Sequence, residues 1–202
     1  MYALVESGYI TKIFTSPKGF IVDDIQYPAD IFYKWTKEEK EDIGIYEVET
    51  DNTNRKDEKW YINTNESYRF DTNKVIRSWD TAIAKKHEDT LWTEEDKIND
   101  LIPEGKDVGD VATRGLKYNL IQEIKKQAAG ILQETDWYIV RKADAGTEVP
   151  SSITTHRAAV RTKCAEMETA ITNAADTPAL EALYTRDENS ERPLGELPRL
   201  ES

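Results

Sequence analysis

The sequence is short of cysteine, histidine and long apolar runs, and each shortage excludes a kind of protein. One cysteine, Cys164, among 202 residues allows no internal disulfide, so the chain is not a disulfide-stapled scaffold. His87 and His156 stand far apart and, with one cysteine, supply too few ligands for structural zinc. No apolar run approaches the roughly 20 residues that span a bilayer, and residues 1–10 lack the features of a secretion signal. We therefore expect a soluble chain that needs no metal or cofactor.

Positive charge and catalytic motifs are scarce as well. The formal net charge is −12 and no dense block of lysine and arginine occurs, so we expect neither nucleic acid nor a membrane as a partner. The glycine patterns of phosphate-binding and dinucleotide-binding loops are missing, as are the serine-hydrolase elbow and a complete calcium loop. With 39 acidic residues, pairs of carboxylates arise by chance and indicate no catalysis. The sequence predicts a protein that is not an enzyme.

Aromatic residues are concentrated in the first half of the chain, where 15 of the 19 fall within residues 1–92. Two apolar runs, YALVE and YITKIF, flank Ser7–Gly8, a pair typical of a two-residue hairpin turn. Thr36 and Glu39 have the spacing of a capping box, which predicts a short helix after them. KWYIN, SYRFD and VIRSW are further strand-like runs. We predict a small β-rich domain with one short helix over residues 1–80.

Residues 81–112 are expected to form an acidic linker. Within them, residues 88–110 hold nine acidic and two basic side chains, together with Pro103. Like charges repel each other, and proline and glycine interrupt helices, so a solvated connector is the simplest interpretation. Apolar residues such as Leu101 and Ile102 leave open that the linker docks on another surface.

Helical periodicity begins at Gly115. Apolar residues then recur every three or four positions in two stretches, separated by a loop with Gly146 and Pro150. This pattern is typical of two amphipathic helices that pack as a hairpin. The predicted seam between them consists of Leu120, Ile124 and Ile131 on the first helix and Val160, Cys164, Met167 and Ile171 on the second.

A third, short helix is expected to start at Asp176, with Pro178 in its first turn, where proline is tolerated. These helices place a hairpin domain at residues 113–186, followed by a polar tail at residues 187–202. A β-rich domain followed by a helical one makes the predicted fold class α+β.

The stretch LQETDWYIV, residues 132–140, places acidic and aromatic side chains where the first helix is expected to end. Trp137 can fold back onto the seam as a core anchor, and Asp136 can be held by an arginine across the hairpin, since bidentate pairing suits arginine. The alternative is a docking surface for another chain, because aromatic residues and arginine are typical interface anchors. Both interpretations use the same residues, which are Asp136, Trp137, Tyr138, Arg141, Arg157 and Arg161.

The segment ILQETDWYIVRKADAGTEVPSSITTHRAAVRT resembles the C-terminal segment of tail proteins from tailed bacteriophages, particularly the tail fibre assembly group. In that group a helix ends in a leucine, a polar step leads to TDW, and a loop with a proline precedes a second helix with R-x-x-x-R. The matching residues here are Leu132, Thr135, Asp136, Trp137, Pro150, Arg157 and Arg161. The N-terminal half is similar only in style.

The resemblance implies a non-enzymatic protein of the virion tail, made in the host cytoplasm, that binds other tail chains. Fibre subunits are the expected partners, and association of copies of this chain is left open. Members of the group either help fibre chains fold and trimerise or stay attached near the fibre tip or baseplate. This chain departs from the shorter, chaperone-like members in its aromatic N-terminal half and acidic linker, which favours a structural component over a transient chaperone.

Two interpretations outside that class are kept. A tail-borne glycan or peptidoglycan hydrolase requires a cleft with two carboxylates, one of which has a raised pKa. A regulatory binding module of the host is compatible with an acidic helical hairpin, because fold does not fix function.

Substitution of Trp137 by alanine separates the two interpretations of the TDW stretch. If the ring is buried in the seam, the free energy of unfolding falls by roughly 3–5 kcal/mol. If the ring belongs to a docking surface, the loss stays below about 1 kcal/mol and partner binding weakens instead. Urea unfolding followed by circular dichroism measures the first quantity.

Overall fold

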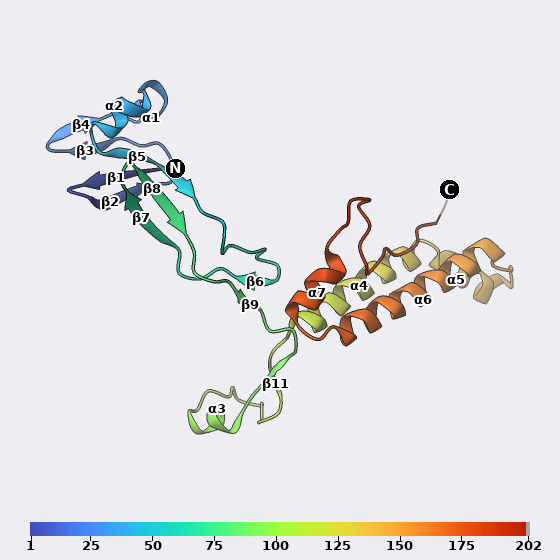
Figure 1. Ribbon diagram of the computed structural model, residues 1–202. Coiled ribbons are helices and arrows are strands. Elements are labelled where there is room, and N and C mark those ends of the chain that lie inside the picture. The colour runs from blue at the N-terminus through green and yellow to red at the C-terminus, as the bar shows by residue number, and fades with distance from the viewer. Residues whose placement is uncertain (201–202) are drawn as a thin grey trace. The chain divides into compact units, whose positions relative to one another are not determined.

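The computed structural model describes residues 1–200, which fold as two compact units, Met1–Ile83 and a second unit that starts at Ala84. The first unit is built mainly of strands and the second mainly of helices (Figure 1). The predicted α+β class is therefore confirmed. Among the described residues, no helix is both long enough and apolar enough to cross a membrane.

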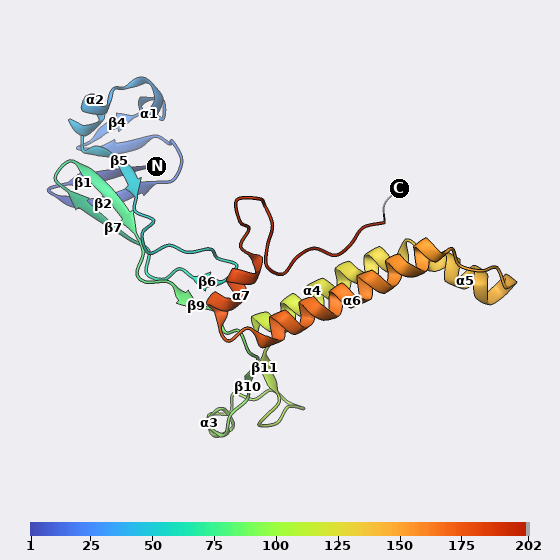
Figure 2. The ribbon, with the colours of Figure 1, turned by 45° about the vertical axis from the view of Figure 1, so that its right-hand side comes forward.

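A five-stranded sheet with the order β2-β1-β5-β8-β7 forms the frame of the first unit (Figure 2). Its strands are β1 (Tyr2–Glu6), β2 (Tyr9–Phe14), β5 (Ile45–Thr50), β7 (Ser67–Asp71) and β8 (Lys74–Ser78). Neighbouring strands run antiparallel except β5 and β8, which are parallel. Ser7 and Gly8 join β1 to β2 with φ values of 52° and 83°, the left-handed pair that a tight hairpin turn requires. The hairpin predicted at these two residues is confirmed.

Both faces of this sheet are buried, because successive side chains of a strand point to opposite sides. On one face Leu4 packs with a phenylalanine cluster that includes Phe14 and Phe32. On the other face Ala3 and Val5 pack with valines of β5 and β8. The edge strands β2 and β7 also contact each other, so the sheet curls around its second core.

The phenylalanine core is covered by four short elements: β3 (Phe20–Val22), β4 (Ile25–Tyr27), α1 (Ile31–Lys34) and α2 (Lys37–Glu41). The predicted capping box opens α2, where Thr36 and Glu39 each accept the other's backbone N–H. The expectation of one short helix is wrong, since α1 precedes α2. The four residues of α1 are too few to show a helical period; α1 is held by the burial of Ile31 and Phe32 and by the ion pair of Lys34 with Asp30.

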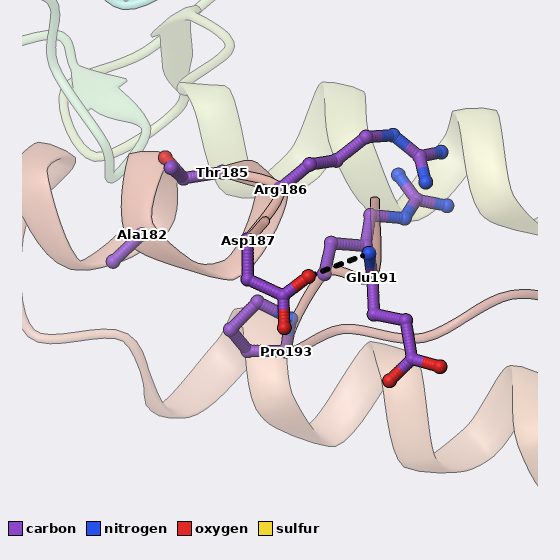
Figure 3. Close-up of a pocket in the computed structure, with 7 residues that line it drawn as sticks. Ala182, Thr185, Arg186, Asp187, Glu191 and Pro193 are labelled. Atoms are coloured by element: carbon purple, nitrogen blue, oxygen red, sulfur yellow. Dashed lines mark hydrogen bonds between the residues drawn. The ribbon is translucent and has the colours of Figure 1, made fainter. Parts of the chain in front are cut away.

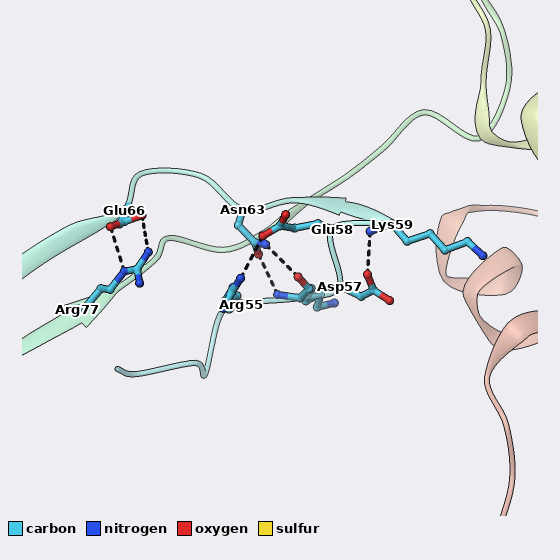
Figure 4. Close-up of polar contacts among 8 residues, drawn as sticks. Arg55, Asp57, Glu58, Lys59, Asn63, Glu66 and Arg77 are labelled. Carbon is cyan, nitrogen blue, oxygen red and sulfur yellow. Dashed lines mark hydrogen bonds and ion pairs between the residues drawn. The ribbon is translucent and has the colours of Figure 1, made fainter. Parts of the chain in front are cut away.

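The loop between β5 and β7 is ordered by polar contacts within the first unit (Figure 4). The Asn63 side chain bonds both the backbone N–H and the carbonyl of Lys56, at 2.9 Å each. Arg77 on β8 holds Glu66 through two parallel hydrogen bonds of 3.0 and 2.9 Å. The loop also contains β6 (Tyr61–Ile62), which pairs with β9 (Ile83–Ala84).

The acidic stretch carries local structure of its own. β10 (Thr90–Leu91) pairs with β11 (Val111–Thr113), and α3 (Glu94–Ile98) lies between them. A second capping box, formed by Thr93 and Asp96, opens α3. We call residues 88–110 the acidic arm.

The second unit is organised by α4 (Leu116–Gln133) and α6 (Ser151–Asn173), which run side by side in both views (Figures 1 and 2). In the sequence, α5 (Asp136–Ala145) lies between α4 and α6. Six of the seven predicted seam residues are buried, namely Leu120, Ile124, Val160, Cys164, Met167 and Ile171, whereas Ile131 is half-buried. The predicted pairing of the two helices is confirmed.

The chain after α6 folds back onto the hairpin. α7 (Thr177–Tyr184) begins as predicted, with the Asp176 side chain accepting the N–H of Ala179. The prediction of a polar tail from residue 187 is wrong for the described part, because Leu194 is only 2% exposed and its N–H bonds the Leu183 carbonyl at 3.0 Å. One leucine among charged residues gives no periodic signal. Residues 201–202 of that tail lie outside the described residues.

Replacing Met167 by alanine tests the seam. This side chain is 1% exposed on the inner face of α6, so its truncation leaves a cavity. We expect the free energy of unfolding to fall by about 2–5 kcal/mol in urea titrations. Thr162→Ala, on the exposed face of the same helix, is the control and should stay within about 0.5 kcal/mol. Equal effects of the two substitutions would contradict the packing of α4 on α6.

Candidate functional site

The chain turns sharply between α4 and α5, and the turn is made by Glu134 and Thr135. Thr135 leaves the helical region, with φ −115° and ψ 5°, so the first helix stops and a new one begins at Asp136. Its N–H and its hydroxyl both donate to the Leu132 carbonyl, at 3.1 and 3.0 Å. A carbonyl that α4 leaves without an intrahelical partner is thereby satisfied. We call residues 132–136 the elbow.

The guanidinium of Arg157, on α6, closes the elbow from across the hairpin. Its Nη1 lies 2.7 Å from the Leu132 carbonyl oxygen and 2.7 Å from the Thr135 hydroxyl, and its Nη2 lies 2.8 Å from an Asp136 carboxylate oxygen. Arg157 is 7% exposed and Thr135 only 2%, so the contacts with Leu132 and Thr135 are shielded from water, whereas the Asp136 side chain is 55% exposed. Charge-assisted hydrogen bonds gain strength in such surroundings. One side chain therefore fixes where α4 ends and where α5 starts.

The prediction that an arginine of the second helix holds Asp136 is confirmed for Arg157. Arg161, one turn further along α6, does not share this role. It is exposed, and its Nη1 lies 3.4 Å from the Arg157 carbonyl. The two arginines of the R-x-x-x-R pattern thus differ: one is buried in the hairpin and the other faces solvent.

The prediction of Trp137 as a core anchor of the hairpin is wrong, because this side chain is 50% exposed. The expected loop after the tryptophan is instead helical, and α5 carries the ring away from the seam. No residue of α5 is buried. The helix ends at Gly146, whose φ of 66° suits a C-terminal cap, and Pro150 precedes α6.

Trp137, Tyr138 and Arg141 come together on α5, as expected for a shared surface. The two rings have centroids 3.8 Å apart, and the Arg141 guanidinium lies 4.8 Å from the Trp137 ring centre and 5.7 Å from that of Tyr138. Cation–π contact with both rings limits the motion of the arginine. The arrangement presents a flat aromatic group with a positive charge beside it.

Two further apolar residues follow the aromatic pair. Ile139 is 44% exposed and Val140 is 65% exposed. Successive residues of a helix point about 100° apart, so the four residues from Trp137 to Val140 cover about 300° of its circumference. A helix that is apolar on nearly every side is normally buried. We call residues 137–141 the α5 surface; it presents apolar and aromatic side chains next to one positive charge.

The structure also shows site residues that the sequence did not reveal. Thr135 was quoted as part of a motif, but its burial and its contact with Arg157 were not foreseen. Arg157 itself occupies a seam position, four residues after the buried Ile153 and three before Val160. The heptad spacing of these three positions is the signal that could have identified it.

Among residues 1–200, the carboxyl groups with a displaced pKa are Asp30, Asp51, Glu66, Asp89 and Asp96. In each, hydrogen bonds from neighbouring donors lower the pKa, whereas a hydrolase needs one carboxyl with a raised pKa. Burial raises the pKa of the Cys164 thiol, which disfavours the reactive thiolate. Within residues 1–200, no three His, Cys, Asp or Glu side chains gather as metal ligands.

One hollow of the second unit lies at the turn after α7 (Figure 3). Its volume is about 530 Å³, and its walls include Arg186, Asp187, Glu191 and Pro193. The Asp187 carboxylate is occupied in accepting the backbone N–H of Glu191 at 2.9 Å. This hollow is formed by a turn that folds on itself, and none of the predicted site residues lines it.

No family model matches the chain, and no curated protein or solved structure is detectably similar to it. The resemblance to phage tail proteins therefore depends on its matching residues alone, which lie in the elbow, at Trp137 and Pro150, and on α6.

Removing the Arg157 guanidinium should loosen the elbow. Arg157→Met keeps much of the apolar stem but loses all three contacts, so we expect the free energy of unfolding to fall by about 2 kcal/mol. Arg161→Met, one turn away and exposed, is the matched control and should change it by less than about 0.5 kcal/mol. Denaturant titration of both variants makes the comparison. Losses of equal size would show that Arg157 does not clasp the elbow.

Proposed function

We propose that the chain is a tail-associated protein of a tailed bacteriophage that acts by binding other tail chains, with fibre subunits as the first candidates. In this proposal it is a structural component near the fibre or baseplate, and it catalyses no reaction. The TDW segment supports the setting, and the geometry of α5 supports the mode of action.

The observation that carries the proposal is that no residue of α5 is buried. A ten-residue helix with so little packing is marginal in water. The contacts of Arg157 with Leu132, Thr135 and Asp136, which we call the Arg157 clasp, nevertheless order Asp136, the first residue of α5. They so present the α5 surface in a defined direction. Burying apolar area contributes roughly 25 cal/mol per Å², which favours a partner that encloses the helix. Arg141 beside the rings favours a partner with a carboxylate at the edge of its cleft.

Mass spectrometry of purified phage particles tests this function. A structural protein should be present in a fixed copy number, whereas a transient assembly chaperone should be absent from mature particles but bound to fibre chains in infected cells. The double substitution Trp137→Ala with Val140→Asp should remove the chain from particles, because it destroys the apolar α5 surface.

The matched control is Thr162→Asp, which adds the same charge to the exposed face of α6 and should leave incorporation unchanged. Circular dichroism should show both variants folded, since no residue of α5 is buried. Incorporation of the α5 variant at the normal level would contradict binding through this helix. Absence of the wild-type chain from both particles and fibre chains would contradict the tail function itself.

A further inference from the structure

The acidic arm presents apolar side chains in a strongly negative setting. It holds nine acidic and two basic residues, which gives a formal charge of −7. On and after α3, Ile98 is 83% exposed and Leu101 is 57% exposed. Two exposed aliphatic side chains thus lie three residues apart on one short, acidic segment.

The acidic arm is fixed at its base, next to the start of α4. The Asp89 carboxylate accepts the Gly115 N–H at 2.7 Å and pairs with Arg114 at 2.6 Å. Gly115 lies so close to the backbone of Glu88 that an added Cβ would stand 2.3 Å from the Glu88 carbonyl carbon. In both views of the second unit, α3 projects away from the start of α4 (Figures 1 and 2). The arm is therefore held out from a fixed base.

A groove of complementary chemistry lies on the same unit. It runs between the second half of α4 and the C-terminal segment, and its volume is about 1010 Å³. Ile131, Leu197 and Leu200 contribute apolar walls, and Lys126 and Arg199 contribute positive charge.

The balance of charge around this groove is positive. Arg186 and Arg192 both pair with the single Glu196 carboxylate, at 2.7 and 2.8 Å, so this trio keeps one net positive charge. In Figure 3, Arg186 extends away from the Asp187 and Glu191 carboxylates, and its side chain lines the groove. The charged side chains that line the groove are Lys126, Arg186, Arg199, Glu134 and Glu196, which together carry +1 in a chain of −12.

We propose that the acidic arm of one copy docks in this groove of a second copy. The arm supplies two aliphatic side chains within a negative frame, and the groove supplies apolar walls with unpaired cations at its rim. The arm leaves the hairpin at the start of α4, whereas Lys126 lies ten residues along it, about 15 Å away. Ile98 stays exposed within its own copy, so the groove is filled from a neighbour.

Such a contact joins two different surfaces. It therefore builds chains or rings of copies, or a dimer where two arms dock reciprocally. This inference does not depend on the proposed tail function, because it uses neither the elbow nor the α5 surface.

Sedimentation velocity of the full chain tests the proposal with two variants. The arm variant carries Ile98→Asp and Leu101→Asp, and the groove variant carries Lys126→Glu and Arg199→Glu. We expect wild type to form dimers or larger species as its concentration rises and each variant to bind itself more than about tenfold more weakly. An equal mixture of the two variants should associate again but stop at dimers, since it contains one intact arm and one intact groove per pair.

The control variant carries Lys12→Glu and Lys18→Glu, which give the same charge change as the groove variant but in the first unit. It should associate like wild type, and association of wild type should weaken in high salt. A wild type that stays monomeric, variants that associate normally, or a mixture that fails to pair would each overturn the proposal. The exposed side chains chosen for substitution leave the helical fold intact, which circular dichroism verifies.

Discussion

The guanidinium of Arg157 holds three oxygens of the elbow at once, and the position of α5 depends on this contact. Without it, the backbone after Gln133 has only the short-range bonds of Thr135 to define its path. With it, one buried cation links the end of α4, the start of α5 and the middle of α6. The seam fixes the two long helices, and the clasp decides where the exposed aromatic residues point.

Local rules explain how much of this fold the sequence predicts. The Ser7–Gly8 turn, the Thr36 capping box and the start of α7 at Asp176 were predictable, because each depends on residues within a few positions of one another. The seam was predictable because its apolar residues recur every three or four positions. The course of the elbow was not, since it depends on a bond between Thr135 and Arg157, which are 22 residues apart. Leu194 was missed for the same reason, because a single buried side chain has no period.

The candidate site likewise has features that the sequence predicts and features that it does not. Sequence reasoning brought Asp136 and an arginine together correctly, since opposite charges on facing helices attract. It placed Trp137 in the core because a tryptophan beside an apolar seam is usually buried. The helical restart at Asp136 rotates that ring into solvent, and no spacing rule signals it. The sheet of the first unit is buried on both faces. Exposed apolar side chains are found on α5 and the acidic arm, the two places proposed for partners, and also in the first unit, at Tyr9, Ile21, Ile25 and Tyr33.

The most direct test is the distance between α5 and α6 with and without the clasp. Spin labels at the exposed positions Ala143 and Thr169, in a chain with Cys164→Ala, report this distance by electron–electron double resonance. A narrow distribution that broadens strongly in Arg157→Met is the expected result, because the guanidinium holds the start of α5 against α6 through the Asp136 carboxylate. A distribution of the same width in both proteins would contradict the central role of Arg157.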